Sequence, residues 1–228
     1  MSGRLVRVPA AWGSGGEAMH DAAGMDVGVE EHTVVAEGTL ARQTAAIRVA
    51  LPEQAVVLGG CCCAHVGGVA GLADRGLRTA VVWVDAHGDL NTPETSPSGN
   101  LWGMPFRMVL DDGHARVEDS VLIGARSLDQ GETDFIAASG LADSAAQLSA
   151  VLDGTDGAYI AFDCDVLDPG EIDCFMPEPN GMAFADAVAL VERVAASAPV
   201  LGMGLTGLVA SDRNPARLRQ LIAAAGLA

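Results

Sequence analysis

The chain has 228 residues, 50% of them hydrophobic, which is enough to bury a sizeable core in one domain spanning residues 1–228. Acidic residues outnumber basic ones by 30 to 13, and the formal net charge of -17 disfavours nucleic acid or an anionic membrane surface as a partner. Every basic residue is an arginine, and the absence of lysine excludes mechanisms that require an amine, such as pyridoxal Schiff-base chemistry.

Short apolar runs alternate with longer segments of helical periodicity along the chain. This pattern is typical of a parallel sheet that is covered by helices on both faces. We predict strands at residues 5–9, 55–59, 79–85, 120–125, 158–163 and 200–205. We predict helices at about residues 37–50, 66–75, 101–111, 131–139, 144–153, 184–197 and 214–226.

Metal-capable side chains follow three of the predicted strands at the point where each strand ends. The first of these strands passes through a Gly-Gly turn to a cysteine, and the other two run into metal-capable residues at alternate positions. The residues concerned are Cys62 with His65 three positions later, then Asp85, His87 and Asp89, then Asp163 and Asp165. Ligands collect beyond the carboxyl ends of parallel strands, and residues at i and i+2 of an extended chain point to one side. We therefore expect these side chains to share one pocket.

Four carboxylates in one pocket repel one another, and burying them without compensation is costly. Divalent cations supply that compensation. A carboxylate-rich set with one imidazole has too many oxygens for a closed tetrahedral site, so it favours two ions that share bridging carboxylates, with manganese as the expected metal. Two such ions can lower the pKa of a water enough to make a nucleophile near neutral pH.

The three contiguous cysteines at 61–63 cannot all reach one site, because adjacent side chains of an extended chain point to opposite faces. We expect Cys62 to be the ligand, with His65 as the competing candidate, and Cys61 and Cys63 to be packing residues. The five cysteines are odd in number and clustered, unlike a secreted disulfide framework. No apolar run approaches a membrane span and no secretory signal is recognisable, so we expect a cytoplasmic protein.

Two other interpretations of the acidic pair in DCD deserve comparison with the metal site. A D-x-D at a strand end is often only a loop start or a helix cap. The run FDCDVLD also resembles the aspartyl nucleophile motif of haloacid-dehalogenase phosphatases. That motif needs a downstream lysine and an early position in its domain, so the late position here and the absence of lysine exclude it.

Taken together, VVLGG, VDAHGDLNTPETSPSGNLWGMP, LIGARSLDQGE and AFDCDVLDPG resemble the ureohydrolase family, which contains arginase, agmatinase and formiminoglutamase. The resemblance runs in order from about residue 55 to residue 182. It implies a three-layer α/β/α sandwich with a mostly parallel central sheet. It also implies a binuclear manganese site that hydrolyses a linear C-N bond of a guanidino or related group, and it is compatible with a homo-oligomer.

The resemblance also implies a role for each site residue. The two metal ions would be bridged by two aspartates and completed by two further ligands each: Asp85 and Asp163 in the bridge, Cys62 and Asp89 on one ion, His87 and Asp165 on the other. Asp89 would in addition be catalytic, orienting the nucleophile. An amino-acid-like substrate would be held at its α-carboxylate and α-amino groups by Asn91, Ser98, Asn100 and Asp129. Alternatively, the Asn and Ser residues merely shape a Pro-rich turn.

Three positions depart from the arginase pattern. Cys62 stands in place of a ligand histidine, and a thiolate is softer and favours zinc or iron. Trp102 replaces a histidine that transfers protons in arginases, and Gly207 replaces a glutamate that pairs with the guanidinium. We therefore predict a substrate whose far end differs from free guanidinium. The alternative is a catalytically inactive protein that binds metal or an amino acid and acts as a sensor or partner subunit.

Overall fold

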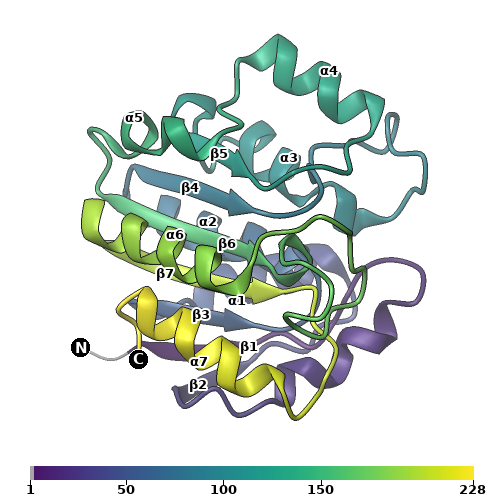
Figure 1. The fold of residues 1–228 in the computed structure, drawn as a ribbon, viewed down its shortest axis with the longest axis vertical. Helices are drawn as coiled ribbons and strands as arrows, with labels where there is room; N and C mark the ends of the chain where they lie inside the picture. Colours follow the sequence, from purple (N-terminus) through teal and green to yellow (C-terminus); the bar gives the residue numbers. More distant parts are fainter. Residues whose placement is uncertain (1–2) are drawn as a thin grey trace.

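A single sheet of seven strands forms the centre of the protein in the computed structural model, which describes residues 3–228 (Figure 1). The strands run in the order β2-β1-β3-β7-β6-β4-β5, and every neighbouring pair in this order is parallel. Their bounds are β1 (Arg4–Arg7), β2 (Glu30–Val34), β3 (Ala55–Leu58), β4 (Thr79–Val84), β5 (Ser120–Ile123), β6 (Gly157–Asp163) and β7 (Val200–Thr206).

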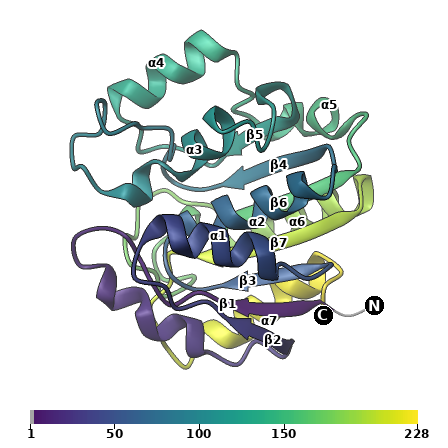
Figure 2. The ribbon, with the colours of Figure 1, turned by 180° about the vertical axis from the view of Figure 1, so that it is seen from behind.

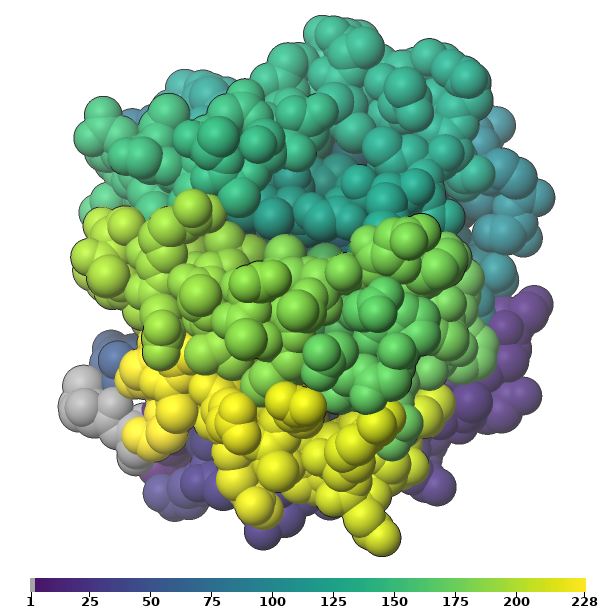
Figure 3. Space-filling model, viewed as in Figure 1, coloured from purple at the N-terminus to yellow at the C-terminus, as the bar shows by residue number. Residues whose placement is uncertain are grey.

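Helices cover both faces of the sheet. The helices α5 to α7 lie on one face (Figure 1) and α1 to α3 on the opposite face (Figure 2), while α4 lies beyond the β5 edge. Figure 3 shows side chains of the light green and yellow segments, α6 and α7, over the first of these faces. The bounds are α1 (Leu40–Ala50), α2 (Cys63–Asp74), α3 (Pro105–Asp111), α4 (Gln130–Ser139), α5 (Leu148–Leu152), α6 (Phe184–Ser197) and α7 (Asn214–Ala224). The predicted three-layer α/β/α sandwich is confirmed.

The central strands divide their side chains between two apolar cores. In β4, Val82 and Val84 belong to the core beneath α5, α6 and α7, whereas Val81 and Trp83 belong to the core beneath α1, α2 and α3. Every residue of β4 is buried, because helices cover both of its faces. This double burial explains the uninterrupted apolar run in the sequence, and it leaves polar groups only where the strand ends.

The structure differs from the predicted elements in a few places. The strand β2 was not predicted, because its sequence EEHTV is short, polar and exposed at the edge of the sheet. The predicted helix at 101–111 is divided into a 3-10 turn at Leu101–Gly103 and α3, which has Pro105 in its first turn. A further 3-10 segment, Gly16–Gly24, was also not predicted. Within the described residues, no helix combines the length and the apolar character needed to cross a membrane.

Candidate metal centre

One cavity of about 290 Å³ lies at the carboxyl ends of the central strands. Asp85 follows the last residue of β4, Asp163 is the last residue of β6, and Cys62 lies just before α2 in the connection from β3. These three strands and β7 are neighbours in the sheet, so the topology alone brings their carboxyl ends together. All six predicted metal ligands line this cavity: Cys62, Asp85, His87, Asp89, Asp163 and Asp165.

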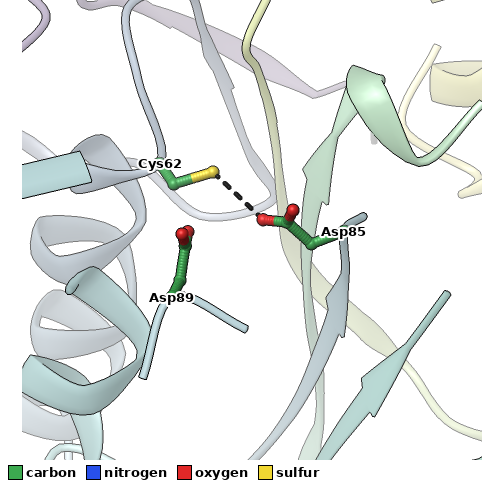
Figure 4. Close-up of side chains that lie close together, drawn as sticks. All are labelled: Cys62, Asp85 and Asp89. Carbon is green, nitrogen blue, oxygen red and sulfur yellow. Dashed lines mark hydrogen bonds between the residues drawn. The ribbon is translucent and has the colours of Figure 1, made fainter. Parts of the chain in front are cut away.

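The first group of donors is formed by Cys62, Asp85 and Asp89, all buried, whose donor atoms lie within 4.8 Å of one another (Figure 4). The Cys62 Sγ lies 3.6 Å from Asp85 Oδ2. Asp89 points toward the same space from a left-handed backbone conformation, with φ of 53°. Within residues 3–228, its Oδ2 atom is buried and has no hydrogen-bond partner. A buried carboxylate oxygen without a partner is the kind of group that a cation would satisfy.

The second group contains Asp85 again, together with His87 and Asp165. The His87 Nδ1 atom lies 3.0 Å from Asp165 Oδ2 and 3.5 Å from Asp85 Oδ1. Asp163 adjoins both groups, because its Oδ2 lies 2.9 Å from the Cys62 sulfur and its Oδ1 accepts a hydrogen bond from the Asp165 backbone. One carboxylate common to two donor groups is the arrangement that a pair of neighbouring ions requires.

The same local turn follows both acidic strands. Asp85 Oδ1 accepts a hydrogen bond from the His87 backbone N at 2.7 Å, and Asp163 Oδ1 accepts one from the Asp165 backbone N at 2.9 Å. Each aspartate therefore folds the chain back toward itself, as in an Asx turn. From the sequence, we expected extended backbone to bring residues i and i+2 together. The structure shows that these turns, rather than an extended strand, aim the side chains of each pair into one cavity.

Burial and mutual repulsion control the acidity of the cluster. Burial, together with the charge of Asp165, raises the pKa of Asp163 to about 7. Burial and the charge of Asp85 raise the pKa of Asp165 to about 6. The pKa of Asp89 is held well above its ordinary value by burial and by the charges of Asp85 and Asp163. Burial opposes the charge of His87, but hydrogen bonds to Asp165 and Asp85 raise its pKa to about 12. The donor set is therefore one that divalent cations would neutralise.

Metal-free protein should lose stability as the pH rises from about 4 to about 7. Asp163 and Asp165 keep their protons in the folded chain up to about pH 7 and about pH 6, whereas the unfolded carboxyls lose theirs near 3.8. The folded state thus binds more protons within this window, so the free energy of unfolding falls as the pH rises. Thermal unfolding of chelator-treated protein at a series of pH values measures this slope. Addition of Mn²⁺ should flatten it, and an unchanged slope would contradict a cation at these carboxylates.

The structure distinguishes between the two candidate ligands, Cys62 and His65. His65 is fully buried outside the cavity, and its two ring nitrogens face Tyr159 and Thr206. Both donor groups described above are built without it. Cys61 and Cys63 pack with Met19 in a small apolar cluster, although Cys61 also reaches the cavity wall. Cys62 is thus the cysteine placed among the carboxylates.

The predicted substrate residues are distributed unevenly around the cavity. Asn91, Ser98 and Asp129 line it, and the Asn91 side chain donates a hydrogen bond of 2.9 Å to Asp129 Oδ2. Asn100 is not part of the lining, and its Oδ1 accepts a hydrogen bond from the Ser14 backbone. Its predicted contact with a substrate stays a prediction, whereas its observed contact shapes the loop, as the alternative interpretation proposed.

Two glutamates near the cluster were not predicted as site residues. Glu132 is buried and accepts hydrogen bonds from the Leu90 and Asp129 backbones, which ties the segment after Asp89 to the start of α4. Glu178 lines the cavity, and its Oε1 lies 3.5 Å from His87 Nε2. A carboxylate on the second nitrogen of a ligand histidine is a common means of orienting the ring. The position of Glu132 could have been predicted, because Asp129 and Glu132 have the spacing of a capping box at the start of a helix. Glu178 lies in an irregular loop, where no sequence pattern indicates its position.

Part of the cavity lining is apolar. The Trp102 indole and the Phe175 ring meet edge to face with centroids 5.5 Å apart, and both line the cavity together with Met19. Gly207, where a glutamate was sought in the sequence, also lines the cavity with φ of 70°. A Cβ at this position would overlap the Asp163 carboxylate. The space for a side chain at 207 is thus already taken by a candidate ligand.

Comparison with known proteins identifies the family to which the chain belongs. A family model described as Arginase family matches residues 15–209. Arginase from Bacillus subtilis (strain 168) is 38% identical over 141 residues, an alignment that covers 51% of this chain and 48% of the relative. The chain therefore spans about half the length of the curated relatives it matches.

Solved structures share the whole fold at lower identity. Arginase from Bacillus caldovelox superposes with a TM-score of 0.87 at 23% identity, covering 100% of this chain and 98% of that one. Formimidoylglutamase from Bacillus subtilis superposes with a TM-score of 0.81 at 18% identity, covering 100% of this chain and 86% of that one. The match to the family model extends over most of the chain, and we conclude that the chain belongs to the arginase family.

Proposed function

We propose that this protein uses two divalent metal ions, Mn²⁺ in the first instance, to hydrolyse a linear C-N bond of an amidine, guanidino or ureido-type group on an amino-acid-like substrate. The observation that carries the proposal is the convergence of four buried carboxylates, an imidazole and a thiol in one cavity. Membership of the arginase family supports the class of reaction. A cytoplasmic location and a homo-oligomeric state stay predictions from the sequence.

In this proposal each residue of the cluster has a defined part. The ions would be shared by Asp85 and Asp163 and completed by two pairs of ligands, Cys62 with Asp89 and His87 with Asp165. When bound, the ions would supply Lewis acidity toward the substrate and lower the pKa of water. Asp89 is the proposed catalytic residue, because it lines the cavity and its Oδ2 is buried without a hydrogen-bond partner among residues 3–228. One oxygen of Asp89 would hold an ion, and the other can accept a hydrogen from the attacking water and return a proton to the departing amine.

The residues that line the cavity suggest the shape of the substrate. Asn91, Ser98 and Asp129 offer amide, hydroxyl and carboxylate groups that suit the α-carboxylate and α-amino ends of an amino acid. Elsewhere in the lining, Trp102 and Gly207 stand in place of ionisable groups. A free guanidinium would meet no paired anion at Gly207, so we expect an N-substituted or less basic group, and arginine itself to be a poor substrate.

A panel of amino acids with guanidino, N-hydroxyguanidino, ureido, amidino and formimino ends tests this proposal. We expect metal-dependent release of urea or ammonia from at least one of them, with a higher kcat/KM than for arginine. Chelation should abolish the release, and added Mn²⁺ should restore it. If protein with bound metal turns over none of these compounds, the proposed function is wrong. Binding of an amino acid without turnover would instead identify the inactive sensor or partner subunit.

A further inference from the structure

A chain of buried polar side chains leads away from Cys62 into the core. The Thr206 Oγ1 lies 3.2 Å from the Cys62 Sγ and 3.0 Å from His65 Nε2. The other ring nitrogen of His65 lies 3.3 Å from the Tyr159 hydroxyl. Thr206, His65 and Tyr159 are fully inaccessible to solvent, and Cys62 is 3% exposed. Because these groups are shielded from water, their hydrogen bonds must be satisfied within the chain.

The direction of the hydrogen bonds follows from counting hydrogens. The His65 ring is fully buried and its two nitrogens face only hydroxyl groups, with no carboxylate of the described chain beside them to balance a charge, so the ring is neutral and carries one N–H. With the hydrogen on Nδ1, the Thr206 hydroxyl would point at His65, and the Tyr159 hydroxyl would have no acceptor among residues 3–228. With the hydrogen on Nε2, Tyr159 donates to His65 and His65 donates to Thr206. Every hydrogen then has an acceptor, and Thr206 is left to donate to the Cys62 sulfur.

Neighbouring residues make room for these side chains and fix the direction of their hydrogen bonds. A Cβ on Gly204, in β7, would overlap the His65 ring, so the buried histidine depends on a glycine in the facing strand. The Cys62 thiol donates its own hydrogen toward Asp163 Oδ2 at 2.9 Å, which leaves the sulfur free to accept from Thr206. The alternative acceptor of the Thr206 hydroxyl, the Phe162 carbonyl oxygen, lies farther away at 3.5 Å.

We propose that Thr206 is a positioning residue that donates a hydrogen bond to the Cys62 sulfur, and that His65 and Tyr159 fix the direction of this bond. The inference rests on Cys62 being a ligand in the proposed metal centre. A ligand histidine is held by a second partner on its other ring nitrogen, and a cysteine has no such second atom. Thr206 supplies the outer contact directly to the sulfur. Held in this way, the thiolate gives one metal position a preference for softer ions such as Co²⁺ or Zn²⁺.

Spectroscopy of Co²⁺-loaded protein tests this inference without reference to turnover. Wild-type protein should show a near-ultraviolet thiolate-to-cobalt charge-transfer band, which Cys62→Ser should remove. In Thr206→Val the band should move to longer wavelength, because the sulfur lone pairs lose a stabilising donor. The affinity for Co²⁺ should fall on the order of 10-fold, as is usual when an outer contact is removed. Thr206→Ser keeps the hydroxyl and should retain the band and the affinity of the wild type.

Two further variants guard against a merely structural effect. Thr79→Val removes another buried hydroxyl, one without a partner among the described residues, and should leave the band unchanged. Tyr159→Phe removes only the hydroxyl group at the far end of this series of hydrogen bonds. It should move the band in the same direction as Thr206→Val, but less. An unshifted band in both Thr206→Val and Tyr159→Phe, or no thiolate band in wild-type protein, would overturn the inference. If the band behaves as expected but no substrate is hydrolysed, the proposed function alone is wrong.

Discussion

Replacing Asp89 by asparagine should lower hydrolysis on the order of 10³-fold, a typical loss for a group that transfers protons. The same substitution should raise the melting temperature of the metal-free protein. Asparagine keeps the size of the side chain but removes a carboxyl whose pKa is held well above its ordinary value by burial and by Asp85 and Asp163. Because the folded wild type binds a proton here that the unfolded chain releases, the gain should grow as the pH rises.

The stability gain expected from Asp89→Asn has a definite size and can be compared with a control variant. Relieving a buried group of this kind is worth on the order of 1–3 kcal/mol. For a domain of this size each kcal/mol moves the melting temperature by roughly 2–4 °C. Thermal unfolding of chelator-treated protein at pH 5 and pH 8 measures the gain, with Asp212→Asn as a control at an exposed carboxylate. Equal stability of Asp89→Asn and wild type at pH 8 would mean that the buried Asp89 carboxylate does not destabilise the metal-free protein.

Restoring an acid at the position of the missing glutamate should destroy the site rather than create an arginase. A side chain in Gly207→Glu would overlap the Asp163 carboxylate at its first carbon. The left-handed backbone at this position, with φ of 70°, adds a conformational penalty on the order of 1–3 kcal/mol for any residue other than glycine. We expect Gly207→Glu to lose at least one metal ion and to lack measurable hydrolysis of arginine.

A second glycine of the same cavity provides the control for this prediction. Gly103 also lines the cavity, but a Cβ there would meet no atom within 4 Å. Gly103→Ala should therefore retain both metal ions and the melting temperature of the wild type, while Gly207→Ala should already weaken metal binding. Metal analysis of the three purified variants distinguishes these outcomes. Efficient hydrolysis of arginine by Gly207→Glu would contradict the prediction that a side chain at position 207 displaces the Asp163 carboxylate.

Much of the site could be predicted because it begins where buried strands end. The run before Asp85 must be apolar, since β4 is covered by a helix layer on each face, so the first charged residue marks the edge of the sheet. The parallel topology then brings this edge next to Asp163. The edge strand β2 could not be predicted, because its exposed side chains give no alternating pattern.

Other features depend on contacts that no local pattern encodes. The sequence left Cys62 and His65 as competing ligands. The choice is made by Thr206 and Gly204 of β7, which lie about 140 positions further along the chain and accommodate His65 in the core. Glu178 reaches His87 from an irregular loop, so its position depends on the tertiary structure alone. The residues after Asp85 were expected to continue an extended chain, but Asx turns direct them instead.

The central claim is a pair of divalent ions held by the carboxylate cluster. Its most direct test is the metal content of the purified protein after reconstitution with Mn²⁺ and removal of excess metal, measured by elemental analysis against protein concentration. We predict two ions per chain in the wild type, since Asp85 takes part in two separate donor groups. Fewer than one ion per chain in correctly folded protein would contradict the proposed centre and the hydrolytic function built on it.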